Sequence, residues 1–464
     1  MIIMQQLNEF RMRGLLIVLI LAICTLHLSC TSNDEPNSNM SRVSDTAHSF
    51  RQFRDIQTKS ILSKLSEGIT QIEVEKYIHE RMNIPSQDVK EILRYDIDED
   101  AYIFIVNLKE GGWYFFSGDI TSEPVLAHGE SGSFKIEEIT EHELGWFSSI
   151  RNHMISNRNN KSREVENNKK EWMRPYRTQM LEQYKNELTR DETDSGDVSI
   201  DIRIDTLINV DYPALTVTHW NQINPWNRQV PMYGNSTRCV AGCTVIAIAQ
   251  LLYYTHYAFG FPNYIYANAS CNDYFYEGPP YDFNLTNLTT STWDLMTAYG
   301  TGTSSYEPYM PALCAYVAQI SNTEYSIDST LLSTYYEPSQ GITVASNYAS
   351  TLSFFQLTGA TTQIFDEATV KNEIAHNRPV LCTGSNSSSI SVGHAFLVHG
   401  YSQFKYREVE TFTDENGAIL EQNITVYDHF YWRINPGAYN QQFINVVRNS
   451  YYPINPTMTV GWTQ

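Results

Sequence analysis

The pattern of apolar and polar positions predicts a small α+β domain in the first third of the chain. Residues 72–82 carry apolar side chains at helical spacing. Residues 101–107 and 112–117 are apolar runs of strand length separated by a Gly-Gly turn, and residues 123–129 resemble a third strand. We therefore expect this domain to cover about residues 45–150.

A charged region follows and marks a boundary. An exposed helix is expected over 172–188, and the acidic run 191–197 (Asp-Glu-Thr-Asp-Ser-Gly-Asp) is a natural site of proteolytic nicking. Only eight of the 32 Lys and Arg residues lie beyond residue 205. This shift in charge predicts an N-terminal domain with its linker over 31–205 and a second domain over 206–464.

The second region alternates helical and strand patterns. Apolar positions at helical spacing follow Cys243, and further helices are expected over 310–320 and 367–375. The C-terminal end is dominated by strands, with a hairpin turn signal at 414–417 (Asp-Glu-Asn-Gly). The two regions together predict an α+β protein.

The N-terminus has the features of an export signal. Two arginines precede the apolar run 15–23, which is too short to span a bilayer comfortably. A small residue precedes Cys30 and a polar, tether-like segment follows it, as at a bacterial lipoprotein cleavage site. We expect residues 1–30 to be a signal peptide, with a lipid on Cys30 favoured over plain secretion. The expected location is the cell surface or outer membrane, with release to the extracellular space as an alternative.

Charge narrows the range of partners. The formal net charge of −20 argues against a nucleic-acid partner. Contact with a membrane is expected only through the lipid anchor.

Five of the seven cysteines lie beyond the signal, so an exported chain keeps at least one thiol outside a disulfide. Cys239 and Cys243 have neither a second cysteine pair nor a His-x3-His partner nearby, which makes a zinc site improbable, and no metal or cofactor is expected. A disulfide between these two is geometrically restrictive, whereas Cys239 could pair with Cys271, Cys314 or Cys382. The sequence leaves that choice open.

Cys243 is the best candidate for a nucleophile. It follows Gly242 at the start of an apolar helix, where backbone N–H groups and the helix dipole favour thiolate over thiol. The same N–H groups can bind a developing oxyanion. A small buried cysteine at a helix end is an equally ordinary explanation when the residue is considered alone.

His394 is the best placed base, because it begins a buried strand and is preceded by Gly393. Asn435 is the candidate that orients the imidazole: a hairpin folded about residue 416 would bring position 435 opposite about 397. Gln222, upstream of the nucleophile, could donate its amide to the oxyanion.

Together these motifs resemble the streptopain-like cysteine peptidases, family C10 of the papain-like clan. The resemblance rests on six segments in the same order as in the family: 124–134, 220–227, 242–250, 293–296, 378–384 and 393–396. It implies a papain-like peptidase domain, with a helix-borne cysteine packed on an antiparallel sheet, preceded by a propeptide domain that occupies the cleft of a zymogen. Carried over, Cys243 is the nucleophile, His394 the base and acid, Asn435 the orienting residue and Gln222 the oxyanion donor, and the substrates are proteins or peptides.

Two departures from the family keep other functions open. The family usually follows its Asn with Trp-Gly-Trp-Gly-Gly, whereas this chain has Pro-Gly-Ala-Tyr after Asn435. The glycine-rich segment expected near 330–345 is also absent. A papain-like binding lipoprotein with weakened catalysis is therefore an alternative, as is an amidase or acyl transferase that uses the same three residues.

Overall fold

The structure is a computed structural model of the whole chain. It describes residues 38–139, 141–188, 198–230, 232–233, 237–260, 262, 293, 296, 309–326, 340–342, 347–385, 393–414, 416–437, 444–448 and 450–463. The expected signal peptide, Cys30 and the acidic run 191–197 lie outside these residues. Among the helices described, none is long and apolar enough to cross a membrane.

The N-terminal part, residues 38–188, is an antiparallel sheet covered by helices. It contains α2 (Ser38–Ser66), α3 (Gln71–Met82), β1 (Val89–Asp96), β2 (Tyr102–Leu108), β3 (Trp113–Ser117), β4 (Val125–Gly129), α4 (Glu141–Arg158), α5 (Arg163–Met173) and α6 (Arg177–Leu188). The helix expected over 72–82 and the three expected strands are confirmed.

The exposed helix expected over 172–188 is confirmed over 177–188, as α6, but not at its start. Trp172 belongs to the end of α5 and is 1% exposed. A short 3-10 turn, Arg174–Tyr176, separates α5 from α6 and contains Pro175. Proline has no N–H and clashes with the preceding turn, so the α-helical hydrogen-bond ladder is interrupted here.

The C-terminal part, residues 198–463, contains most of the long strands. Its main elements are β5 (Ser199–Tyr212), α7 (Cys243–Phe259), α9 (Tyr309–Ile320), α10 (Tyr348–Phe354), β10 (Thr361–Ile364), α11 (Glu367–Ala375), β11 (Val380–Ser385), β12 (Gly393–Thr413), β13 (Ile419–Asn435), β14 (Ile444–Val447) and β15 (Ile454–Val460). Two short hairpins, β6 (Met232–Tyr233) with β7 (Thr237–Arg238) and β8 (Glu324–Ser326) with β9 (Gln340–Ile342), complete the described strands. The helices expected over 310–320 and 367–375 are confirmed.

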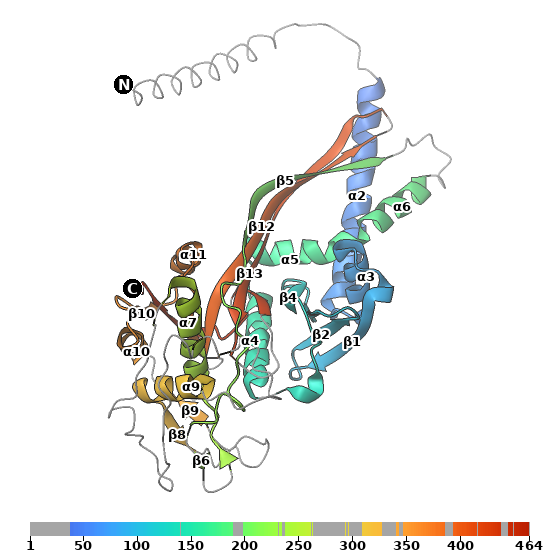
Figure 1. Cartoon of the computed structure of the whole chain (residues 1–464). Helices are drawn as coiled ribbons and strands as arrows, with labels where there is room; N and C mark the ends of the chain where they lie inside the picture. Colours follow the sequence, from blue (N-terminus) through green and yellow to red (C-terminus); the bar gives the residue numbers. More distant parts are fainter. Residues whose placement is uncertain are drawn as a thin grey trace, which may run out of the picture.

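One eleven-stranded antiparallel sheet joins the two parts. Its order is β1-β2-β3-β4-β14-β13-β12-β11-β15-β10, with β5 paired to β12. The connection is made by β4 and β14, where Ala127, His128 and Gly129 pair with Val446, Asn445 and Ile444. The N-terminal part is therefore hydrogen-bonded into the sheet of the C-terminal part (Figure 1).

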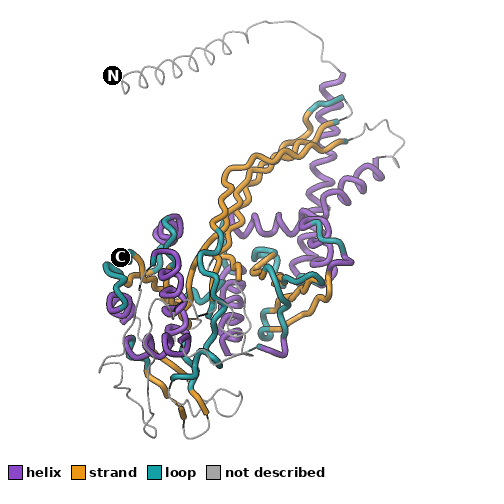
Figure 2. Tube along the Cα trace, viewed as in Figure 1, coloured by secondary structure: helices purple, strands orange, loops and turns teal. Residues whose placement is uncertain are grey.

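Three strands extend beyond the body of the molecule and form a feature we call the arm: residues 199–212, 401–413 and 419–432. The arm runs alongside α2 and reaches toward its N-terminal end (Figure 2). Leu397 pairs with Asn435 in the β12–β13 ladder, so the predicted hairpin register is confirmed, and a bulge lies between Val398 and Gly400.

β5 crosses the boundary expected at residue 205. It pairs with β12 continuously from Ser199 opposite Thr413 to Tyr212 opposite Tyr401. The residues just before 205 are therefore part of the C-terminal sheet.

The central strands separate two hydrophobic cores. Leu381 and Leu397 lie in a core with α7 and α9, and Trp220 and Trp293 are buried in the same core. The opposite face carries a second core, shared by the two parts: Phe115, Trp146, Phe147, Cys382, Phe396, Trp432 and Ile444. Because this second core mixes side chains from both parts, neither can be removed without exposing apolar surface.

We predict that the two parts unfold together. Trp146 is fully buried and its ring meets Tyr451 of the C-terminal part with centroids 5.6 Å apart. Trp146→Ala is expected to cost about 3–5 kcal/mol and to lower the midpoint of a single transition in denaturant, followed by far-UV circular dichroism and tryptophan fluorescence. Ile72→Ala, at an exposed position, serves as the control and should have little effect. Separate transitions for the two parts would contradict the shared core.

Candidate active site

Cys243 is the first residue of α7. Gly242, its N-cap, has φ 96°, a backbone conformation that favours glycine, so the sequence Gly-Cys is required by the entry of the chain into the helix. Residues 244–253 are buried, which fixes the helix in the core and its N-terminus beside the beginning of β12. The thiol therefore has a rigid support.

The thiol lies against the beginning of β12. The backbone N–H of Ala395 donates a hydrogen bond to Cys243 Sγ at 3.4 Å. β13 pairs with β12 only from Leu397 onward, so it offers the Ala395 amide no partner and the sulfur takes that place. Cys243 is thereby next in space to the residue that follows His394.

Burial opposes ionisation of the thiol. Desolvation raises the pKa of Cys243, although hydrogen bonds from the Ala395 and Thr244 backbones act in the opposite direction. The thiolate expected from the helix terminus is thus not favoured in this arrangement, because the loss of water outweighs the N–H groups.

His394 is buried beside the end of β13. Its Nε2 lies 2.8 Å from the carbonyl oxygen of Pro436, and a hydrogen on Nε2 would donate to that oxygen. The tautomer so selected leaves Nδ1 as the proton acceptor. Burial lowers the pKa of His394 to about 3.

Aromatic rings surround the imidazole on the core face shared by the two parts. Phe396 stacks at a centroid distance of 6.0 Å, and Tyr452 and Tyr451 approach to 5.2 and 6.2 Å. Trp432, three residues before Asn435, packs on Phe430 and Tyr401. The two tyrosines shield the imidazole.

The tyrosine pair is held from both sides. A Cβ on Gly384, which pairs with His394 across the sheet, would lie 1.9 Å from the Tyr452 carbonyl oxygen, so only glycine fits there. From the N-terminal part, Ser149 Oγ accepts a hydrogen bond from the Tyr452 backbone N–H at 3.2 Å. The sequence offered no motif that singles out these tyrosines, because their role depends on contacts between distant segments.

Asn435 lies at the end of β13 with its side chain turned toward α7. Its Nδ2 donates to Thr218 O at 2.8 Å, Gln250 Oε1 at 2.9 Å and Thr216 Oγ1 at 3.1 Å. These contacts fix the chain just before Pro436, whose carbonyl contacts His394. Asn435 therefore supports the position of that carbonyl.

Gln222 lies close to the nucleophile segment. Its carbonyl oxygen accepts a hydrogen bond from the Ala241 N–H at 2.8 Å, two residues before Cys243. Asn227 Nδ2 donates to Cys239 O at 2.9 Å and fastens the same loop. The main chain of Gln222 thus lies beside the start of α7.

The remaining cysteines have no disulfide among the residues that the structure describes. Cys239, Cys314 and Cys382 are buried and separate from one another, whereas Cys271 lies outside the described residues. Pairing of Cys239 with Cys314 or Cys382, left open by the sequence, is therefore wrong. Within the same described residues, no cluster of His, Cys, Asp or Glu could hold a metal ion.

We predict that the chain loses stability as the pH falls below about 6.5. Burial lowers the pKa of His394 and His399 to about 3 and that of His128 to about 4. Between the pKa of these histidines in the folded chain and their pKa in the unfolded chain, the unfolded chain binds more protons. The free energy of unfolding is therefore greatest above the unfolded-state pKa and decreases toward pH 4.

The free energy of unfolding in urea, measured between about pH 7 and 4, checks this. His399→Gln should flatten the dependence, whereas the exposed His79→Gln should leave it unchanged. Stability that rises on acidification would show that these imidazoles are not held neutral.

Comparison with known proteins gives a family match that includes this site. Residues 220–417 match the model of the Peptidase C10 family, a region that contains Gln222, Cys243 and His394 and ends before Asn435. A search of curated proteins gave no match.

Two solved structures are similar. A mutant fragment of Prevotella intermedia prointerpain A has 15% identity and a TM-score of 0.47, covering 80% of this chain and 98% of its own. Active wild-type interpain A cysteine protease from the same organism has 19% identity and a TM-score of 0.36, covering 54% of this chain and 94% of its own. Over the nucleophile helix and the histidine strand, this chain is therefore similar to the cysteine peptidases of the Peptidase C10 family.

Proposed function

We propose that the chain is the zymogen of an exported cysteine endopeptidase that uses Cys243, His394, Asn435 and Gln222. The observation that carries the proposal is the contact of the Cys243 thiol, at the N-terminus of a buried helix, with the strand that begins at His394. A nucleophile at a helix end and a base on the adjacent strand are the two parts that thiol-dependent acyl transfer needs.

In the proposed reaction, the His394 imidazole turns from the shared core toward the thiol and accepts its proton while Cys243 Sγ attacks the carbonyl carbon of a peptide bond. The tetrahedral oxyanion receives hydrogen bonds from the Cys243 N–H and the Gln222 side-chain amide. The imidazolium then protonates the leaving amine, and a thioester remains. Water, deprotonated by His394, attacks the thioester, releases the carboxylic acid and returns the proton to the thiol.

The proposed role of Asn435 is to position the catalytic histidine. A papain-like orienting residue accepts a hydrogen bond from the imidazole, and here the Pro436 carbonyl lies within hydrogen-bond distance of Nε2. Asn435 supports this arrangement through Thr218 and Gln250. The proposed Cys-His-Asn mechanism thus uses the side chain of Asn435 and the carbonyl of the next residue together.

The N-terminal domain and linker expected over 31–205 are proposed to be the propeptide, without residues 199–205, which belong to β5. The N-terminal part contacts the tyrosines that surround His394, through Ser149 and Trp146, which supports an inhibitory role. Activating cleavage is proposed before Val198, because β5 starts at Ser199 and a later cut would interrupt its ladder with β12. Residues 1–30 are proposed to be the signal, with Cys30 lipidated and the protein tethered at the cell surface or outer membrane.

We expect Cys243→Ala to abolish peptide hydrolysis and self-processing near 189–197. Cys239→Ala is the matched control: it removes a buried thiol four residues away and should retain most of the activity. The measurement is cleavage of a fluorogenic peptide library together with gel analysis of the chain. Hydrolysis that persists at an unchanged rate in Cys243→Ala, with Cys239→Ala as a reference for folding, would refute the assignment of the nucleophile.

A papain-like binding lipoprotein with weakened catalysis is the second candidate. Burial raises the pKa of Cys243, which favours an inert thiol. We expect the alternatives to differ after the N-terminal part is removed: an active peptidase should react with iodoacetamide at Cys243 at least about 10-fold faster than the full chain at neutral pH. The rate of labelling, located by mass spectrometry, decides between them, because equal slow rates in both forms would favour the binding protein.

A further inference from the structure

The arm carries two acidic residues on one face, Glu408 and Glu410, which we call the acidic ladder. They pair with arginines of the N-terminal part. Glu408 is 1% exposed, and its two carboxylate oxygens are paired with Arg174, at 2.5 Å, and with Arg177. Arg177 also pairs with Glu410 at 2.8 Å. Since each of these groups loses water on docking, their pairing depends on both surfaces being present.

Helix α2 contributes a second set of contacts farther along the arm. Arg54 pairs with Glu421 at 2.5 Å, and the ring of Phe50 meets that of Phe412 with centroids 4.7 Å apart. Phe412, Leu420, Val198 and Phe50 form a small hydrophobic cluster. The arm therefore offers carboxylates and aromatic rings, and the N-terminal part offers the matching guanidinium groups.

The N-terminal part also covers one edge of the arm. β13 pairs with β14 only over Tyr431–Ile434, so before Tyr431 this edge has no strand partner among the residues that the structure describes. On that stretch Arg51 donates to Leu420 O at 2.9 Å and Asn167 donates to Val426 O at 2.8 Å. Side chains thus satisfy carbonyls that a further strand would otherwise occupy.

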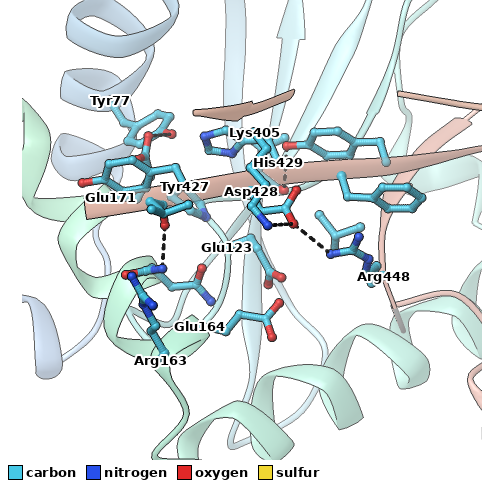
Figure 3. A pocket seen from close by; sticks show the side chains of 18 residues that line it. Tyr77, Glu123, Arg163, Glu164, Glu171, Lys405, Tyr427, Asp428, His429 and Arg448 are labelled. Atoms are coloured by element: carbon cyan, nitrogen blue, oxygen red, sulfur yellow. Dashed lines mark hydrogen bonds and ion pairs between the residues drawn. The ribbon is translucent and has the colours of Figure 1, made fainter. Parts of the chain in front are cut away.

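Between these contacts, a cavity with charged walls separates the N-terminal part from the C-terminal part. A cavity of about 350 Å³ lies where α5 and β4 face β13, and its walls include Glu123, Arg163, Glu164 and Asp428 (Figure 3). In it Asp428 pairs with Lys405 and Arg448 at 3.7 Å, contacts that stay within the C-terminal part. Along the arm the two parts are therefore held by discrete ion pairs, which should weaken with salt, whereas the shared core and the β4–β14 ladder elsewhere should not.

We propose that the arm is a docking surface that keeps residues 38–188 bound after the chain is cut between α6 and β5, so that cleavage yields a two-chain complex. This inference rests on the proposed function only in that activation includes such a cut. The occupant is the chain's own N-terminal part, recognised by Glu408, Glu410 and Glu421 through its arginines. Release of the peptidase then requires a second event that removes or degrades this part.

The test uses the full chain with Cys243→Ala, in which the recognition sequence of a site-specific endoprotease replaces residues 191–197. After cutting, size-exclusion chromatography with light scattering at about 0.1 M and 1 M salt reports whether the pieces stay together. We expect co-elution at the lower salt concentration and a larger dissociated fraction at the higher one, because salt screens the ion pairs of the arm but leaves the shared core in place. Separation at the lower concentration would overturn the proposal, and so would a dimer of the C-terminal piece that excludes the N-terminal piece.

Glu408→Gln should raise the Kd of the cut pieces at least about 10-fold, because it leaves two arginines facing a neutral group. Glu410→Gln, at a less buried position, should act in the same direction if Glu408→Gln fails to fold. Asp205→Asn is the matched control: Asp205 pairs with Arg407 on the opposite face of the arm and should leave the Kd unchanged. Equal effects of Glu408→Gln and Asp205→Asn would overturn the assignment of the docking face.

The result does not depend on whether the chain is a peptidase. Cys243→Ala removes the proposed nucleophile, and the added endoprotease makes the cut. If the chain has no peptidase activity, the proposed function is wrong but the docking measurement is unaffected. If the cut pieces separate, only the proposed docking surface is wrong.

Discussion

Backbone hydrogen bonding along β12 is the constraint on which the rest of the structure depends. This one strand pairs with β11 at its beginning, with β13 over most of its length and with β5 in the arm. Its first residues carry His394 and the amide that contacts Cys243, while its distal residues carry Glu408. Because an antiparallel ladder admits no one-residue slip without turning its side chains over, the position of the candidate site and that of the acidic ladder are fixed by the same register.

The candidate site combines a partly exposed thiol with a buried imidazole. The thiol and the imidazole are each accompanied by main-chain groups, the Ala395 N–H and the Pro436 carbonyl, whose positions follow from the strands. Burial disfavours the Cys243 thiolate, and so raises the pKa of that thiol. It also disfavours the His394 imidazolium, and so lowers the pKa of that ring. A neutral thiol and a neutral imidazole are poorly suited to attack, and hydration of the site would favour the charged form of each.

Much of the local structure could be predicted from the sequence because it depends on short-range patterns. The helix after Gly242 and the Asp-Glu-Asn-Gly turn are of this kind, and the turn correctly placed Asn435 opposite Leu397. Contacts between distant segments could not be predicted. The Tyr451–Tyr452 pair has no signature, since its place beside His394 results from Gly384 and from a helix some 300 residues earlier.

The open edge of β13 has a consequence for how the chain folds. Unpaired strand edges associate with one another, and proteins usually protect them with charges or by covering them. β5 bears alternating charges at Asp201, Arg203 and Asp205, whereas the edge of β13 is covered by Arg51 and Asn167 from the N-terminal part. Since that part is synthesised first, it is available when the hairpin emerges and can keep the nascent strands from aggregating, as an intramolecular chaperone does.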